Sequence, residues 1–167
     1  FRVPADRMQA GTYLVAAPAT RGDVTVRGVF PGDQIPIVNK LRETGASVEE
    51  GGDWIRVRAS ERPRAVRVRT MPHPGFPTDM QQPMCALLTE GQGTSEIEET
   101  IYENRIGHID ELNRMGADIR LSGKTAIVAG ISNLRGAVVE ATDLRCGAAL
   151  VVAGLAADGL TQIKNVH

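Results

Sequence analysis

The feature that most constrains the fold of this 167-residue chain is an internal repeat. The segment IVNKLRETGASVE, residues 37–49, matches HIDELNRMGADIR, residues 108–120, in its spacing of apolar, charged and glycine positions. An offset of 71 residues relates Gly45 to Gly116, and the same offset relates Gly22 to Gly93. Because this period is longer than that of common solenoid repeats, it predicts a symmetric α/β domain whose helices pack on sheets.

Three segments of the chain also open in the same way. Each begins with an aspartate that can accept N–H bonds at a helix start, continues as an apolar helix, and reaches a glycine suited to a left-handed cap. An alternating stretch such as DVTVRGV or TSEIEETI then predicts a half-buried strand. The aspartates are Asp6, Asp79 and Asp143, and the glycines are Gly22, Gly93 and Gly159.

One unit is therefore expected to contain a helix, a strand, a helix and two further strands, over about 70 residues. We expect repeats at about 4–72 and 73–140 and an incomplete third repeat at about 141–167. Residues 1–167 would then form part of a single domain. Since the chain opens without an initiator Met and stops inside a repeat, we expect it to be a piece of a longer protein.

Charge and composition argue against several classes of function. The net charge of -1 gives no drive toward nucleic acid or a membrane surface, and no apolar run approaches the roughly 20 residues of a membrane helix. His73, His108 and His167 form no ligand motif, and two cysteines are too few for a disulfide framework. We therefore expect no metal, no nucleic-acid partner and no membrane partner.

The basic stretch RVRASERPRAVRVR, residues 56–69, has two interpretations. It could bind nucleic acid, but it contains no aromatic residues on which bases could stack. Two strands that carry their arginines on a solvated face explain the alternation of arginine and valine better.

Six phrases, lying in order along nearly the whole chain, carry a resemblance to a known family. They are PADRMQAGTYLVAA, GDVTVRGV, PGFPTDMQ, ETIYENR, HIDELNRMGADI and ATDLRCGAALVVAGLAADG. Together they resemble the enolpyruvyl transferases, and within that family the branch that acts on UDP-N-acetylglucosamine. The resemblance implies an inside-out α/β barrel domain, built from repeated helix-and-sheet units, that forms one wall of a substrate cleft.

The implied activity is transfer of the enolpyruvyl group from phosphoenolpyruvate to the 3'-hydroxyl of UDP-N-acetylglucosamine, with release of phosphate. This reaction opens peptidoglycan synthesis in the bacterial cytoplasm, and no cofactor is expected. The resemblance also implies a second domain outside this chain, which would carry the family's reactive cysteine. Without that second wall we expect no turnover, and we expect exposed apolar surface that favours self-association.

Asp79 is the implied catalytic residue, and it would receive the proton of the sugar hydroxyl. It follows the proline-rich stretch PHPGFPT, residues 72–78, whose prolines restrict the backbone that leads to it. The alternative is a helix N-cap, because Asp6 and Asp143 occupy equivalent places in the repeat. Pro83 fits only a first helical turn, so the helix should begin close to Asp79.

Four further residues are implied as substrate contacts. Ile101 would offer its main-chain groups to the nucleotide sugar, although its side chain fits strand core. Arg105 suits the oxyanions of the substrates, and its alternative role is a surface ion pair with Glu103 or Asp110. Asp143 and Arg145 match cleft residues, or else they form a helix-start acid beside a solvated arginine.

The two cysteines, Cys85 and Cys146, fall inside apolar helical stretches, so we expect buried and unreactive thiols. Two other classes of function stay open at this point. One is the sister transferase that acts on a shikimate-type acceptor. The other is a non-catalytic repeat domain, which would have no need to keep Asp79, Arg105 and Arg145 together.

Overall fold

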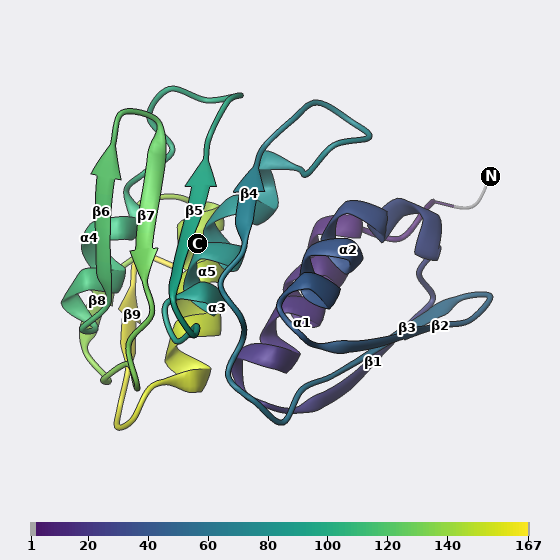
Figure 1. Ribbon diagram of the computed structural model, residues 1–167, viewed down its shortest axis with the longest axis horizontal. Helices are drawn as coiled ribbons and strands as arrows, with labels where there is room; N and C mark the ends of the chain where they lie inside the picture. The colour runs from purple at the N-terminus through teal and green to yellow at the C-terminus, as the bar shows by residue number, and fades with distance from the viewer. Residues whose placement is uncertain (1–2, 167) are drawn as a thin grey trace.

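The structure is a computed structural model that describes residues 3–166. Over these residues five α-helices, nine strands and two short 3-10 helices follow one another (Figure 1). In chain order the elements are α1 (Arg7–Ala19), β1 (Asp23–Arg27), η1 (Pro31–Gln34), α2 (Ile35–Glu43), β2 (Ser47–Glu50), β3 (Trp54–Arg58), β4 (Arg67–Arg69), η2 (Thr78–Met80), α3 (Gln81–Leu88), β5 (Thr94–Glu98), α4 (His108–Arg114), β6 (Asp118–Ser122), β7 (Thr125–Ala129), β8 (Val138–Glu140), α5 (Leu144–Ala156) and β9 (Gln162–Lys164).

The order of these elements confirms the repeat. The series α1-β1-α2-β2-β3-β4 recurs as α3-β5-α4-β6-β7-β8, and α5-β9 begins a third copy. Each complete copy has one strand more than the unit we expected, and the added strands are the three-residue strands β4 and β8. The alternation of arginine and valine in residues 56–69 predicted β4, whereas no such pattern predicted β8. The boundaries 4–72, 73–140 and 141–167 stay a prediction, and the last residue, His167, lies outside the described residues.

The extra strands join each copy to the next. The sheets have the orders β1-β3-β2, β4-β5-β7-β6 and β8-β9. β4 closes the first copy but pairs in parallel with β5 of the second, and β8 pairs in the same way with β9 of the third. Neighbouring copies therefore share a sheet and cannot separate without breaking strand pairing.

The first helix of each copy lies in the centre of the molecule. α1, α3 and α5 pack against one another, with the sheets on the outside (Figure 1). Every residue of α3 is buried, as expected for a helix with neighbours on all sides. Leu14 of α1 and Leu150 of α5 are fully buried in the same core. Helices inside and sheets outside are the predicted inside-out α/β arrangement.

The predicted helix caps are confirmed at two of the three aspartates. An oxygen of Asp6 accepts the N–H groups of Met8 and Gln9 at 2.8 and 3.1 Å. Asp143 does the same for Arg145 and Cys146 at 2.7 and 2.9 Å. The cap prediction was wrong for Asp79, whose side chain caps no helix. This carboxylate is therefore available for other contacts.

The predicted glycine caps do not lie at the ends of their helices. α3 ends at Leu88 and α5 at Ala156, so Gly93 and Gly159 come five and three residues later, although both take the left-handed conformation, with φ values of +96° and +94°. After α1, Arg21 takes this conformation with φ 52°, and Gly22 does not. The prediction at Gly22 was therefore one residue late, because the helix end turns before the glycine.

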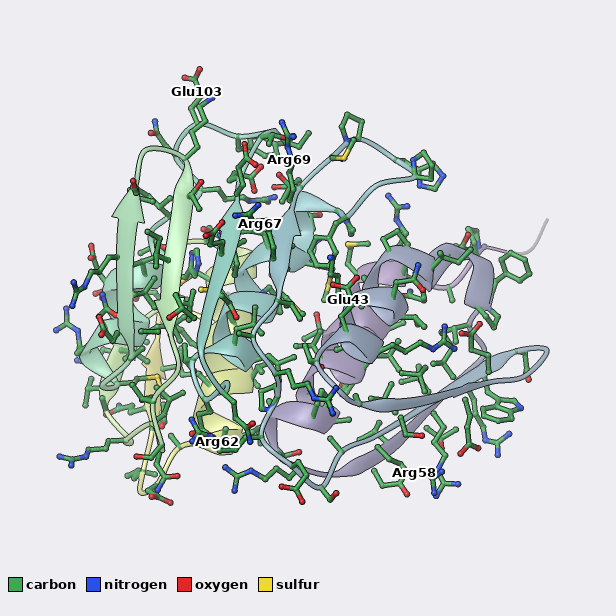
Figure 2. All side chains as sticks on the ribbon, in the orientation of Figure 1. Glu43, Arg58, Arg62, Arg67, Arg69 and Glu103 are labelled. Atoms are coloured by element: carbon green, nitrogen blue, oxygen red, sulfur yellow. The ribbon has the colours of Figure 1, made fainter. Side chains whose placement is uncertain are left out.

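The basic stretch forms the two predicted strands, β3 and β4, with valines inward and arginines outward. Arg67 and Arg69 extend from the outer face of β4 (Figure 2). They pair with Glu96 and Glu98 of β5 at 2.5 and 3.3 Å. Exposed ion pairs of this kind contribute little stability, but they neutralise the positive charges of Arg67 and Arg69 in the basic stretch.

Arg62, between these strands, departs from the solvated pattern. Its guanidinium donates to the carbonyl oxygens of Glu90, Gly91 and Ile131 at 2.6–3.0 Å. It therefore ties the connection between the first two copies to the second copy. None of the helices within residues 3–166 has the length and apolar character that a membrane span needs.

Candidate active site

Asp79 lies at the end of a closed loop that leads into the central helix. Met71 N–H donates to the Phe76 carbonyl at 2.9 Å, and the Phe76 side chain is buried. The chain then enters η2, which holds Asp79, and continues into α3 at Gln81. The helix begins close to Asp79, as Pro83 predicted. The carboxylate therefore stands on a short, well-anchored segment rather than on a free loop.

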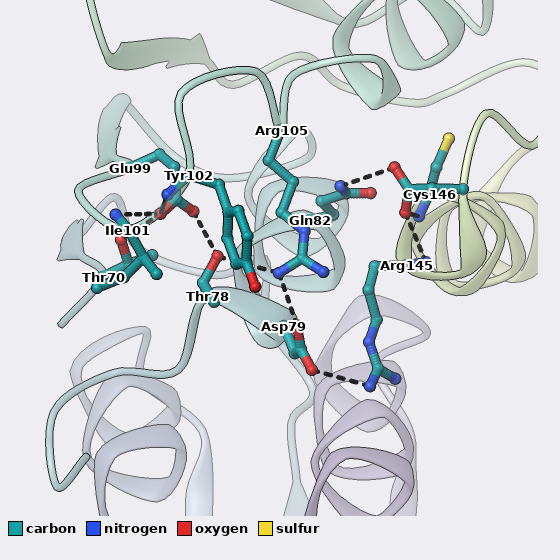
Figure 3. A network of polar contacts seen from close by, with 11 residues as sticks. Thr70, Thr78, Asp79, Gln82, Glu99, Ile101, Tyr102, Arg105, Arg145 and Cys146 are labelled. Carbon is teal, nitrogen blue, oxygen red and sulfur yellow. Dashed lines mark hydrogen bonds and ion pairs between the residues drawn. The ribbon is translucent and has the colours of Figure 1, made fainter. Parts of the chain in front are cut away.

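Two arginines from different parts of the chain hold this carboxylate (Figure 3). Arg105, in the loop after β5, donates from Nη1 to one Asp79 oxygen at 2.6 Å. Arg145, in the first turn of α5, donates from Nη2 to the other oxygen at 2.9 Å. The exposed fractions of the Asp79, Arg105 and Arg145 side chains are 32%, 21% and 23%, so the cluster is reached by solvent. The fold thus assembles one anion and two cations at a partly open site.

The electrostatic environment keeps Asp79 ionised. Its partial burial would raise the pKa of the carboxyl, but the hydrogen bond from Arg105 and the charges of Arg145 and Arg105 outweigh burial. The pKa of Asp79 therefore lies below its ordinary value. At neutral pH the group is a carboxylate that can accept a proton.

Arg105 is fixed by more than its ion pair. Its Nη1 also lies 3.1 Å from Thr78 Oγ1, and its guanidinium lies 4.8 Å from the centre of the Tyr102 ring. The alternative of a surface pair with Glu103 or Asp110 was wrong, since the partner of Arg105 is Asp79.

Asp143 has a different task from Asp79. It caps α5 with one oxygen, and its other oxygen lies 3.3 Å from Nε2 of Gln82. Burial would raise the pKa of Asp143. The opposing effects, chiefly the hydrogen bonds from the Cys146 N–H and the Gln82 amide, lower it by more than burial raises it, so the pKa lies below the ordinary value. Asp143 thus positions the helix turn from which Arg145 reaches Asp79. The alternative of a solvated arginine at position 145 was wrong, because Arg145 pairs with Asp79.

Ile101 lies in the loop after β5, and its side chain is 39% exposed. The prediction that this side chain belongs to the strand core was wrong. Its N–H donates to Glu99 Oε1 at 2.8 Å. Residues 101–105 line an open depression, which includes the exposed Tyr102 and the Arg105 that pairs with Asp79.

Sequence reasoning missed Glu99. It is one of three glutamates in EIEE, residues 96–99, and nothing in the sequence separates it from the others. Glu96 and Glu98 form exposed ion pairs, whereas Glu99 is 3% exposed. Only the tertiary structure shows which of the three points inward.

Neither a metal cluster nor a reactive thiol accompanies this site. In residues 3–166, no group of three or more His, Cys, Asp or Glu side chains is arranged to hold a metal ion. The predicted burial of Cys85 and Cys146 is confirmed. Burial raises the pKa of the Cys85 thiol to about 12, which makes it a poor nucleophile.

The fold and the site define an enolpyruvyl transferase domain, and comparisons with known proteins agree. The chain belongs to the family described as EPSP synthase (3-phosphoshikimate 1-carboxyvinyltransferase), whose model matches residues 1–167. Among solved structures it is similar to the enolpyruvyl transferase NikO from Streptomyces tendae, with a TM-score of 0.87 and 26% identity, over 99% of this chain and 40% of that one. An EPSP synthase from Acinetobacter baumannii, at 17% identity and a TM-score of 0.74 over 98% of this chain and 39% of that one, shares the fold.

Curated relatives place the chain more finely within this family. A UDP-N-acetylglucosamine 1-carboxyvinyltransferase 3 from Symbiobacterium thermophilum is 56% identical over 97% of this chain. A UDP-N-acetylglucosamine 1-carboxyvinyltransferase from Desulfofundulus thermocisternus is 55% identical over 100% of it. The chain spans 38% of the first relative and 69% of the second. The resemblance that the sequence predicted is therefore confirmed.

Proposed function

We propose that this chain is part of a transferase that moves the enolpyruvyl group of phosphoenolpyruvate to the 3'-hydroxyl of UDP-N-acetylglucosamine and releases phosphate. This is the 1-carboxyvinyltransferase reaction of class EC 2.5.1.7. The single observation that carries the proposal is the Asp79 carboxylate held between Arg105 and Arg145 at an open site. The names of the relatives, at 50–56% identity, support the choice of acceptor.

In this proposal Asp79 is the base. Its carboxylate takes the proton of the 3'-hydroxyl as the sugar oxygen bonds to C2 of phosphoenolpyruvate, while C3 gains a proton from a general acid that the second domain would supply. Elimination then breaks the bond from C2 to the phosphate oxygen, and C3 returns a proton to the conjugate base of that acid as the double bond forms again. A base must lie within hydrogen-bond reach of the proton it removes, and the partly exposed Asp79 can be approached in this way.

Arg105 and Arg145 are proposed to bind the anionic groups of the substrates. A guanidinium fork matches phosphate and carboxylate oxygens, so a bound anion competes with Asp79 for the same donors. When an arginine turns to the substrate, Asp79 loses part of the charge that lowers its pKa. Asp79 thus becomes a stronger base when substrate is present. Asp143 supports Arg145, and Ile101 offers its main-chain carbonyl to the nucleotide sugar.

The second candidate is the sister reaction, with 3-phosphoshikimate as acceptor. The observation that favours it is the family description, which names that enzyme and covers the whole chain. Both candidates use phosphoenolpyruvate, so they differ in the acceptor alone.

A binding experiment separates the two. UDP-N-acetylglucosamine and 3-phosphoshikimate are titrated into the chain in separate calorimetric or NMR experiments. We expect weak binding of the nucleotide sugar, weakened further in Asp79→Ala, and no turnover without a second wall. The matched control is Asp23→Asn, which removes an aspartate that pairs with Arg56 at 2.6 Å away from the site. Binding of 3-phosphoshikimate alone would favour the sister reaction, and binding of neither acceptor would contradict both assignments.

The partners follow from the same proposal. A second domain of the same protein would supply the other wall of the cleft, and the reaction would take place in the bacterial cytoplasm, where it supports cell-wall synthesis, cell shape and division.

Apolar side chains along residues 138–160 are exposed, and a surface of this kind favours association. We therefore expect the 167-residue chain to self-associate, which sedimentation velocity at several concentrations would test. The side chains are Val138, Leu144, Val151, Leu155 and Leu160.

A further inference from the structure

Glu99 is a buried carboxylate that accepts four hydrogen bonds. Its Oε1 accepts the Thr70 hydroxyl at 2.8 Å and the N–H groups of Ile101 and Tyr102 at 2.8 and 3.1 Å. Its Oε2 accepts the Thr78 hydroxyl at 2.8 Å. A carboxylate that leaves water needs such donors to offset its desolvation, and an ionised carboxylate can only accept. The network is drawn in Figure 3.

The two oxygens of Glu99 bind the two segments that form the Asp79–Arg105 pair. Thr78, held by one oxygen, immediately precedes Asp79. The N–H groups held by the other oxygen open the loop that ends at Arg105. Thr78 Oγ1 lies in addition 3.1 Å from Arg105 Nη1, so the chain of contacts runs from Glu99 through Thr78 to the arginine. No hydrogen bond or ion pair joins Glu99 directly to Asp79 or Arg105.

The first copy of the repeat forms the equivalent strand without a carboxylate at this position. β1 and β5 are related by the 71-residue offset, and the position that corresponds to Glu99 is Gly28. Gly28 has a φ of +74° and no side chain, yet the strand before it pairs with β3 as β5 pairs with β7. The carboxylate is present in the copy that carries Asp79 and Arg105, and absent from the equivalent place in the first copy.

We infer that Glu99 is a positioning residue of the site, one that holds Thr78 and the 101–105 loop so that Arg105 meets the carboxylate of Asp79. Its relevance to the transfer reaction rests on the proposed function. Its effect on the geometry of the pair does not, so the two can be tested apart.

The test is a pH titration of the Asp79 carboxyl carbon by NMR in the chain without substrate. In Glu99→Ala, Arg105 is released and the pKa of Asp79 should rise toward its ordinary value. Loss of the negative charge of Glu99 would by itself lower that pKa, because like charges disfavour ionisation. The sign of the change therefore separates positioning from a direct charge effect, and a fall or no change would overturn the inference.

Two further variants complete the experiment. Glu99→Gln keeps an oxygen for the two N–H groups and places an amide opposite Thr78 Oγ1, which can accept. It should therefore hold the pair together and show no rise. Thr78→Val removes the link to Arg105 and should raise the pKa of Asp79 even if Glu99→Ala does not fold. No rise in a folded Thr78→Val chain would equally refute the inference.

The matched control is Glu90→Ala. Glu90 is also a buried glutamate of the second copy, 6% exposed, and it accepts the Leu134 N–H at 2.9 Å beyond the far end of α3. Its loss should destabilise the chain without moving the pKa of Asp79. If UDP-N-acetylglucosamine fails to bind while the Asp79 pKa responds as expected, the proposed function fails and the role of Glu99 in arranging the pair stands.

Discussion

His108, the first residue of α4, should make the chain sensitive to mild acid. Its side chain is fully buried, and neither ring nitrogen has a hydrogen-bond partner within the described residues. Burial lowers the pKa of the imidazole from 6.5 to about 4, against the opposing effect of the nearby Asp143 charge. The native chain therefore holds His108 neutral at pH values where the unfolded chain protonates it.

The sign and size of the effect follow from the two pKa values. Below pH 6.5 the unfolded state binds more protons than the native state, so the free energy of unfolding falls as the pH falls. Each pH unit between the two values corresponds to about 1.4 kcal/mol. The stability due to neutral His108 is present above pH 6.5, is reduced by about 2 kcal/mol at pH 5, and by about 3 kcal/mol at pH 4.

Urea unfolding between pH 7.5 and 4 measures this loss. His108→Met removes the titrating group and keeps an apolar side chain, so its stability should depend less on pH by the amounts above. Asp79 and Asp143 do not interfere with this measurement. Their pKa values are lowered from 3.8, so the stability that their ionised forms contribute is lost only below about that pH. NMR signals of the His108 ring should not titrate above about pH 5. Equal pH dependence in both chains, or a ring that titrates near pH 6.5, would refute the reasoning.

Two further predictions concern packing and reactivity. A Cβ on Gly130 would lie 1.9 Å from the Gly91 carbonyl oxygen, so Gly130→Ala should lower the free energy of unfolding by about 3 kcal/mol. Gly52 has open space around its Cβ position, and Gly52→Ala should change stability by less than about 0.5 kcal/mol in the same urea experiment. Cys85 should resist iodoacetamide at pH 8 in the native chain and react in guanidinium, because its thiol is buried with a pKa of about 12. Rapid labelling of the native chain, followed by mass spectrometry, would contradict the burial.

The site draws on three separate parts of the repeat. Asp79 comes from the turn before the central helix, Arg105 from the loop after β5, and Arg145 from the start of α5. α1, α3 and α5 pack together in the centre of the molecule, and the turn before α3, the loop after β5 and the first turn of α5 meet at Asp79 (Figure 3). The three equivalent helix-start segments carry the same residue type, and the one whose aspartate does not cap a helix forms an ion pair with two arginines instead.

Asp79 illustrates this change. In the first and third copies the equivalent aspartate accepts main-chain N–H groups and caps its helix. In the second copy the 3-10 turn η2 precedes α3, and the carboxylate faces two arginines instead. The repeat by itself made the three aspartates equivalent, because it predicts the same local structure in each copy; only the family resemblance singled out Asp79.

Much of the fold was available from the sequence. Apolar spacing, aspartate caps and glycines near helix ends are local signals, so helices and strands could be predicted from neighbouring residues. The repeat then implied a symmetric α/β domain, and six phrases indicated the family and its aspartate. The strand β8 was not predicted, because its three residues are too few to show a clear alternation.

The tertiary structure decided what sequence spacing cannot encode. It showed that Arg105 and Arg145, 40 residues apart in the chain, share one carboxylate. It also separated Glu99, which is buried, from Glu96 and Glu98, which form surface pairs. The physical reason is that a charged side chain gives the same local signal whether it faces solvent or a buried cluster of donors. Its role depends on partners that only the packing of distant segments brings within hydrogen-bond distance.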